Sequence, residues 1–197
     1  MDIKASITAG YQRGNAILFT RDSECLQELI RLIQLQTHQT LILWALDCAK
    51  RPLKMFELKY PNEPRLRNAL DLSAAWSRGL IKMPEAKRAI LAAHAIAKEI
   101  DDKVAIALIH AVAQAGSTVH VETHALGLVF YELSAIVFSV GIENCDLPVY
   151  EKIDYYIERL LYWQINGDKL NISWAKFLMN DTALNKEKLL SERIKSK

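Results

Sequence analysis

The chain has 197 residues, of which 51% are hydrophobic and 24% are charged, a balance typical of a globular protein and not of a disordered one. Its formal net charge of +2 is too small to indicate nucleic acid as a partner. No apolar run reaches the roughly 18 uncharged residues of a membrane span, and the first residues, MDIKASITAG, lack the pattern of a secretory signal. We therefore expect a cytoplasmic protein that binds neither a membrane nor nucleic acid.

Helical patterns fill most of the chain, and β-branched alternation is absent beyond a short AILFT stretch near the N-terminus. In chain order, helices are expected at 23–37, 40–50, 53–61, 65–78, 85–100, 102–115, 123–140, 148–164 and 173–179. A kink or break is expected at Pro52, because proline cannot donate a helical hydrogen bond. The sequence thus predicts an all-α, single-domain bundle of about seven to eight mostly antiparallel helices. A short helical-repeat array is the alternative.

The helix boundaries are expected at particular residue types, because proline suits a first helical turn and glycine suits the position after a helix. The boundary residues are Pro64, Pro84 and the cap Asp101 at helix starts, and Gly79, Gly116 and Gly141 after helix ends. Three parts follow: an N-terminal segment with one helix (1–39), a helical core domain (40–166), and a short helix with a basic, partly mobile tail (167–197). The three cysteines show no CxxC spacing and are expected to be free thiols.

Isolated histidines interrupt three apolar helices. His94 and His110 are each the only polar residue in their stretch, and their distances from the intervening turn differ little. The same holds for His110 and His124 across the next turn, so these three histidines are expected at one height on adjacent helices. In QAGSTVHVETHALGLVFYEL, His120 lies four residues before His124 and is expected on the same helix face.

This cluster allows three interpretations. In the first, which the sequence favours, the histidines form a hydrogen-bonded polar layer with Asp47 as their partner, because a buried carboxylate needs a donor. In the second, His120, His124 and His94 bind zinc or another divalent metal. In the third, the cluster performs acid–base chemistry without a cofactor. A zinc-protease site is excluded, since the spacing is His-x-Glu-x-His and not HExxH.

The stretch from about 40 to 140 resembles a known family. Its features are Trp-Ala-x-Asp-Cys-Ala from Trp44, Trp76 ahead of Arg78-Gly79, Ala93-His94, and His120-Val121 followed by His124-Ala125. In order and spacing these resemble the bacterial Imm-5-like immunity proteins. The resemblance implies an all-helical domain that neutralises a toxin protein by binding it, with no catalytic residue carried over. Pro52 departs from the family pattern, and the part after Pro148 lies outside the resemblance.

Two functions therefore stand beside each other. The first is a non-catalytic interaction protein that binds and neutralises a toxin. The alternative is a small helical enzyme or a ligand- or metal-binding protein that uses the candidate cluster Asp47, His94, His110, His120 and His124. The sequence is also compatible with a homo-oligomer.

Overall fold

The computed structural model describes residues 3–179 and 185–195, without the side chains of 191 and 193–195. This part of the chain is helical and contains no strand, which confirms the all-α prediction. The helices are α1 (Ile3–Gln12), α2 (Gln27–Gln34), α3 (His38–Cys48), α4 (Lys50–Lys59), α5 (Arg65–Ser77), α6 (Met83–Ile96), α7 (Lys103–Ser117), α8 (His124–Val140), α9 (Asp146–Asn166), α10 (Lys176–Met179) and α11 (Lys186–Lys195). Short 3-10 turns occur at η1 (Glu24–Leu26), η2 (Ile142–Asn144) and η3 (Gly167–Lys169).

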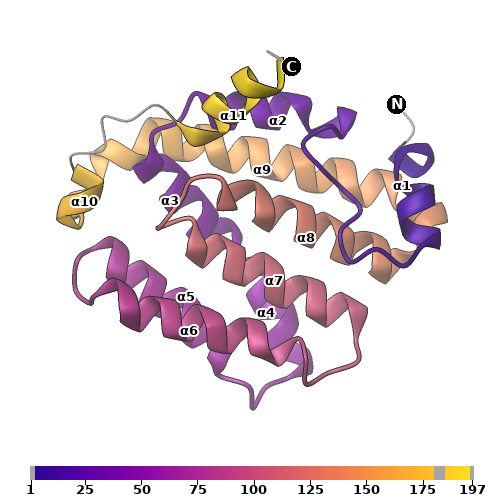
Figure 1. Cartoon of the computed structure of the whole chain (residues 1–197), viewed down its shortest axis with the longest axis horizontal. Coiled ribbons are helices and arrows are strands. Elements are labelled where there is room, and N and C mark those ends of the chain that lie inside the picture. The colour runs from indigo at the N-terminus through magenta and orange to yellow at the C-terminus, as the bar shows by residue number, and fades with distance from the viewer. Residues whose placement is uncertain (1–2, 180–184, 196–197) are drawn as a thin grey trace.

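The helices close into a bundle around α7. This helix packs against α3, α4, α5, α6 and α8, and α9 packs along α2, α3 and α8. In Figure 1, α9, α8, α7 and α6 run side by side across the molecule, with α2 and α11 on the α9 side and the α5–α6 hairpin at the opposite edge. A repeat array would bring together only neighbouring units. The contacts of α3 with α9 and of α4 with α7 instead support a closed bundle.

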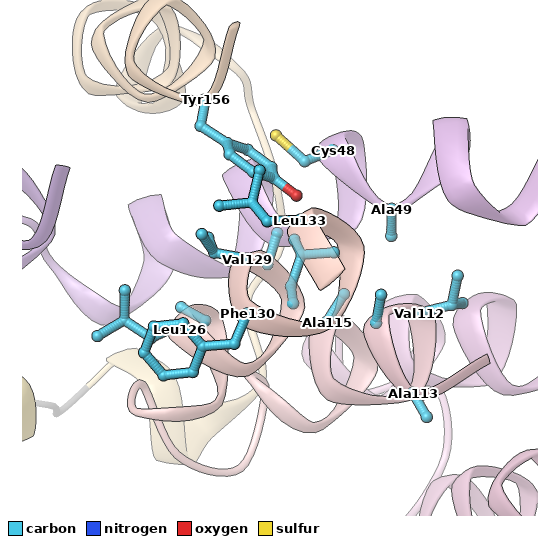
Figure 2. Packing of buried hydrophobic residues seen from close by; sticks show 14 of the residues in the cluster. Cys48, Ala49, Val112, Ala113, Ala115, Leu126, Val129, Phe130, Leu133 and Tyr156 are labelled. Carbon is cyan, nitrogen blue, oxygen red and sulfur yellow. The ribbon is translucent and has the colours of Figure 1, made fainter. Parts of the chain in front are cut away.

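One large hydrophobic cluster holds this bundle together and draws residues from Ile3 to Leu160. Trp44 and Tyr156 are its largest buried side chains, and the indole Nε1 of Trp44 donates to the backbone oxygen of Tyr156 at 3.0 Å. Figure 2 shows Tyr156 of α9 beside Cys48 of α3 and Leu133 of α8, within the same cluster. The expected division at residues 39/40 and 166/167 stays a prediction.

A charged pair lies inside this core. The carboxylate of Glu132 accepts a hydrogen bond from the Tyr156 hydroxyl and pairs with the ammonium group of Lys152, and all three side chains are buried. Burial raises the pKa of Glu132, although Lys152 opposes the shift. Burial also raises the pKa of the Cys48 thiol well above its ordinary value, so Cys48 is a packing residue and not a nucleophile.

Some helix boundaries differ from the expected ones. Gly79 and Gly141 follow α5 and α8 with positive φ angles of 73° and 81°, as expected for glycine after a helix. Gly116 instead lies inside α7, in its last turn. Glycine suits this position because α7 passes close to α5: a Cβ would come 2.6 Å from the Oγ of Ser73. The cap of α7 is Asp102 and not Asp101, since the Asp102 carboxylate accepts from two backbone N–H groups of the first turn.

The break near Pro52 is present, three residues before the proline. The chain turns at Ala49, and Pro52 lies in the first turn of α4, where a missing N–H costs least. Residues 50–59 therefore form a separate helix.

Both ends of the chain differ from expectation. The N-terminal segment contains α1 in addition to α2, and AILFT forms neither a helix nor a strand. The expected mobile tail forms α11, which packs on α2. The buried carboxylate of Glu187 pairs with Arg21, and the side-chain amide of Asn185 donates to two backbone oxygens at the end of α2. Residues 180–184 and 196–197 of this C-terminal part lie outside the described residues, and the expected mobility of the tail stays a prediction.

Candidate functional site

A groove of about 280 Å³ brings most of the candidate histidines to one face of the molecule. We call it the histidine groove. It lies where α5, α6 and the α7–α8 turn meet, at the end of the α5–α6 hairpin that is joined by Gly79. Its lining consists of Trp76, Met83, Lys87, Ile90, Leu91, His94, Ser117, His120 and His124.

Helix α6 supplies one wall of the groove. Met83, Lys87, Leu91 and His94 recur at three- and four-residue intervals and therefore lie on one helix face. The helix begins at Met83, and Pro84 and Glu85 lie in its first turn. There the Glu85 carboxylate accepts a hydrogen bond from the backbone N–H of residue 82. Unlike most apolar residues of the bundle, Met83 (42% exposed) and Leu91 (57%) are open to solvent.

Trp76 provides the opposite, nearly buried wall, with an exposed fraction of 7%. Its ring stacks on that of His120 at 6.2 Å and on that of Phe177 at 5.5 Å between centroids. Phe177 belongs to α10, which is fixed to the bundle by two hydrogen bonds. The backbone N–H of Ala175 donates to the oxygen of Ser77 at 2.9 Å, and the Gln39 amide donates to the oxygen of Leu178 at 3.0 Å.

His94 and His110 contact each other, which their similar heights on α6 and α7 allow but do not determine. Their Nδ1 atoms lie 2.8 Å apart, so one ring donates a proton to the other. His110 also packs on the Tyr131 ring at 4.9 Å and faces a second, smaller cavity of about 150 Å³. Burial lowers the pKa of both histidines, and the neighbouring His110 lowers that of His94 further. The pair is therefore neutral at pH 7.

His124 is held at the start of α8 by the helix next to it. Its Nδ1 lies 2.6 Å from Oε1 of Gln114, which requires a proton on that nitrogen. Gln114 can cross α8 at this point because residue 127 is glycine, where a Cβ would come within 3 Å of three Gln114 side-chain atoms. Burial is the main cause that lowers the pKa of His124, with His120 and His94 adding to it.

The expectation that His120 and His124 share a helix face is wrong. α7 runs through Gly116 to Ser117, so His120 lies in the turn before α8 and is exposed. Two contacts hold this turn. The ring of His38 donates from Nε2 to the backbone oxygen of Thr118 at 2.7 Å, and the buried carboxylate of Glu122 faces the ammonium group of Lys186 in α11 at 3.5 Å.

The expectation that Asp47 is the partner of the histidines is also wrong. Its carboxylate accepts hydrogen bonds from Nε of Arg159 at 2.8 Å and from Nε1 of Trp163 at 3.0 Å, both on α9. These donors, with Lys50, hold the pKa of Asp47 below its ordinary value although burial opposes them. A helical stretch apolar on nearly every side indicated a buried acid, but its partner lies 112 residues away in sequence and carries no local signal.

The described residues contain no group of three or more His, Cys, Asp or Glu side chains placed to hold a metal ion. His94, His120 and His124 do line the same groove. However, the Nδ1 atoms of His94 and His124 are already engaged by His110 and Gln114. As placed here these three histidines do not form such a group, and a metal site that uses them stays a prediction.

Four residues of the site were missed because they read as ordinary helix or core positions. Trp76 and Phe177 resemble packing aromatics in the sequence, and Lys87 and Leu91 resemble a solvated helix face. A usable signal was present in α6. Two apolar residues, Met83 and Leu91, lie on the same helix face as Lys87. This face is separate from the buried residues of α6 that pack into the core, namely Ala86, Ala89, Ile90 and Ala93.

A family model matches the sequence of this chain. The family model described as "Imm-5 like putative immunity protein" matches residues 31–159, about two thirds of the chain. The match is wider than the stretch 40–140 on which the resemblance was based, and it includes part of the region after Pro148. No curated protein and no solved structure matches the chain. Within the described residues, no helix is both long and apolar enough to cross a membrane.

Proposed function

Because the chain belongs to the Imm-5-like family, we propose that it is a bacterial, cytoplasmic immunity-type protein that neutralises a toxin by binding it and catalyses no reaction of its own. The family match is the observation that carries the proposal. The matched range contains α5, α6 and the α7–α8 turn, the elements from which the histidine groove is built.

The groove itself supports a binding role. It combines solvent-exposed apolar side chains, Met83 and Leu91, with an almost buried tryptophan and polar groups at its rim. Protein interfaces concentrate aromatic and aliphatic anchors in this way, with polar groups around them. The bundle below is closed and fully packed, so the groove is presented on a rigid support.

The alternative, an enzyme built on a buried Asp/His cluster, loses its main support. Asp47 is bonded to Arg159 and Trp163 and not to a histidine. Of the histidines in the groove, His94 is bonded to another histidine and His124 to an amide, and neither bond raises the basicity of the ring as a carboxylate partner would.

Co-expression tests the proposed function. The products of the genes that flank the gene for this chain are expressed one at a time in bacterial cells, with and without the chain. We expect one of them to stop growth alone and to permit growth when the chain is present, and the two proteins to elute as one complex in size-exclusion chromatography.

Two results would contradict the proposal. One is protection without complex formation, which would indicate that the chain modifies the toxin or its target. The other is the absence of protection against every growth-inhibiting product although the chain is folded and abundant in the cells.

A further inference from the structure

Positive charge gathers around the histidine groove. From Trp76 to His94 the chain carries Arg78, Lys82, Lys87 and Arg88 against a single acid, Glu85, a net charge of +3 in a protein whose total is only +2. Lys87 lines the groove, and the other three lie within two residues of a groove residue in the chain. Lys176 is a fifth cation and is next in sequence to Phe177 of α10, which stacks on Trp76.

These five cations are exposed and take part in none of the ion pairs formed by the described residues. Several other helices carry basic side chains that face a carboxylate, as Arg65 of α5 does with Glu63 and Glu99. The Glu85 carboxylate is occupied at the start of α6, where it accepts a backbone hydrogen bond. The segment that forms the α6 side of the groove therefore carries positive charge that no ion pair of the described residues offsets, and Lys87 brings part of this charge into the groove.

The floor of the groove is apolar. Trp76, Ile90 and Leu91 line it, and Phe177, which stacks on Trp76, is 48% exposed. Two of the histidines in the groove, His94 and His124, add little charge at pH 7, since burial lowers the pKa of each. A complementary ligand must therefore bring apolar side chains to the centre and negative charge to the edge.

We infer that the histidine groove binds an acidic polypeptide segment of the toxin, with an aromatic or aliphatic side chain inserted between Trp76 and Leu91 and carboxylates facing Lys82, Lys87, Arg88 and Lys176. This inference rests on the proposed function, since it names the surface used and the chemistry of the partner. It also predicts that the toxin is not recognised through a positively charged, nucleic-acid-binding cleft, which this rim would repel.

A nucleic acid is the other polyanion that a basic rim with aromatic side chains could attract. Aliphatic side chains argue against it here. Met83 and Leu91 occupy the exposed face of α6 on either side of Lys87, where a nucleic-acid surface would present further cations and hydrogen-bond donors.

Helix α10 gives the groove a part that lies outside the matched family range. Phe177 and Lys176 come from beyond residue 159, yet Phe177 contacts Trp76 directly. Because this wall is contributed by the C-terminal extension, we expect it to help select the particular toxin that the protein binds.

Fluorescence anisotropy with defined probes tests the inference on the full chain. The probes are a short fluorescein-labelled peptide of Glu residues with a central Phe-Leu pair, the same peptide with Gln in place of Glu, and a labelled single-stranded DNA of similar length. We expect the acidic peptide to bind and the Gln peptide to bind at least about tenfold more weakly. Added salt should weaken the binding of the acidic peptide.

Matched variants locate the binding. Lys87→Glu and Leu91→Gln change exposed groove positions on α6, and Lys54→Glu and Leu58→Gln make the same changes at exposed positions on α4 outside the groove. We expect each groove variant to bind the acidic peptide about tenfold or more weakly than the wild type does. Each α4 variant should bind it with unchanged affinity. All four substitutions are on helix surfaces, so folding is checked by circular dichroism.

No peptide binding, equal binding of the acidic and Gln peptides, equal loss in the α4 variants, or tighter binding of the DNA would each overturn the inference. The proposed function fails separately. If the peptide binds in the groove but no growth-inhibiting product is neutralised, the function is wrong and the groove is a binding site for another acidic protein. If a toxin is neutralised equally by wild type and Lys87→Glu, the function holds and the groove inference is wrong.

Discussion

His94 and His110 share a hydrogen bond between like atoms, and this makes the pair sensitive to pH. A neutral imidazole donates from one nitrogen and accepts at the other, so the Nδ1–Nδ1 contact of 2.8 Å needs at least one unprotonated Nδ1. When both rings are protonated, two donors and two positive charges face each other. The contact that joins α6 to α7 is then lost.

We predict that the free energy of unfolding falls as the pH drops below about 6.5, the ordinary histidine pKa. Burial lowers the pKa of His94, His110 and His124 in the folded protein. Above about pH 6.5 they are neutral in both states and their contribution is complete. Below it the unfolded chain takes up protons that the folded chain does not, until the pH reaches the lowered values. Urea unfolding at pH 7.5, 6.5 and 5.5 measures the slope, at most about 1.4 kcal/mol per pH unit for each histidine.

The variant His110→Gln provides the control. It removes one of the titrating groups and keeps a side chain able to hydrogen-bond His94, so its stability should depend less on pH over the same window. A slope equal to that of the wild type would show that these histidines do not cause the acid sensitivity.

Asp47 illustrates a buried acid whose partners are remote in sequence. We predict that Asp47→Ala lowers the free energy of unfolding by about 1–3 kcal/mol, because Arg159 and the indole N–H of Trp163 lose their shared acceptor. Lys50→Ala, which removes only the exposed partner of the same carboxylate, should cost less than about 0.5 kcal/mol. Equal losses in the two variants would contradict this assignment of partners.

At the scale of elements, small residues set how closely the helices approach. Gly116 allows α7 to lie against α5, and Gly127 allows the side chain of Gln114 to cross α8 and reach His124. The sequence places Gly116 after a helix and Gly127 within one, and it reveals neither of these close approaches.

We predict that Gly116→Ala costs about 1–3 kcal/mol of stability, because the new Cβ would lie 2.6 Å from the Oγ of Ser73 and the core resists the shift. Adding Ser73→Ala removes that oxygen, although the Ser73 Cβ would still be only 3.3 Å away. The double variant should therefore recover part of the loss in thermal unfolding. No recovery would mean that the cost of the alanine arises elsewhere.

Helix α11 is fixed by a few specific contacts and by little apolar burial. We predict that Glu187→Ala releases it, because the carboxylate is 1% exposed and pairs with Arg21 of the segment before α2. Hydrogen exchange should accelerate in residues 186–195, with a smaller change in the α7–α8 turn that Lys186 contacts through Glu122. Glu192→Ala, on the exposed side of the helix, should leave exchange unchanged. Equal acceleration in both variants would show that the Arg21 pair does not hold the helix.

For the whole molecule, hydrophobic periodicity was enough to predict the class of fold. The long amphipathic and Ala-rich segments became α2 to α9 because each has an apolar face that the others cover. Short α1 was missed, and α7 was ended too early at Gly116, because glycine is a weak signal when tertiary contacts favour it.

The candidate site could be predicted only in part. The similar heights of His94 and His110 followed from helix rise, and the structure adds that their rings contact each other. The rotation of each helix about its axis could not be predicted from the sequence. This rotation decides that Asp47 faces α9 and that Trp76 faces His120. Trp76 is also covered by Phe177, which is just over a hundred residues later in the chain and which no local pattern reveals as its neighbour.

The central claim is that the chain neutralises a toxin through the histidine groove, and a hydrogen-exchange footprint of the purified complex tests it most directly. Bound toxin should slow exchange in the start of α6, the α7–α8 turn and α10, the elements that carry Met83, His120 and Phe177. Protection confined to other surfaces, such as α4 or the outer face of α9, with no change in these three elements, would contradict it.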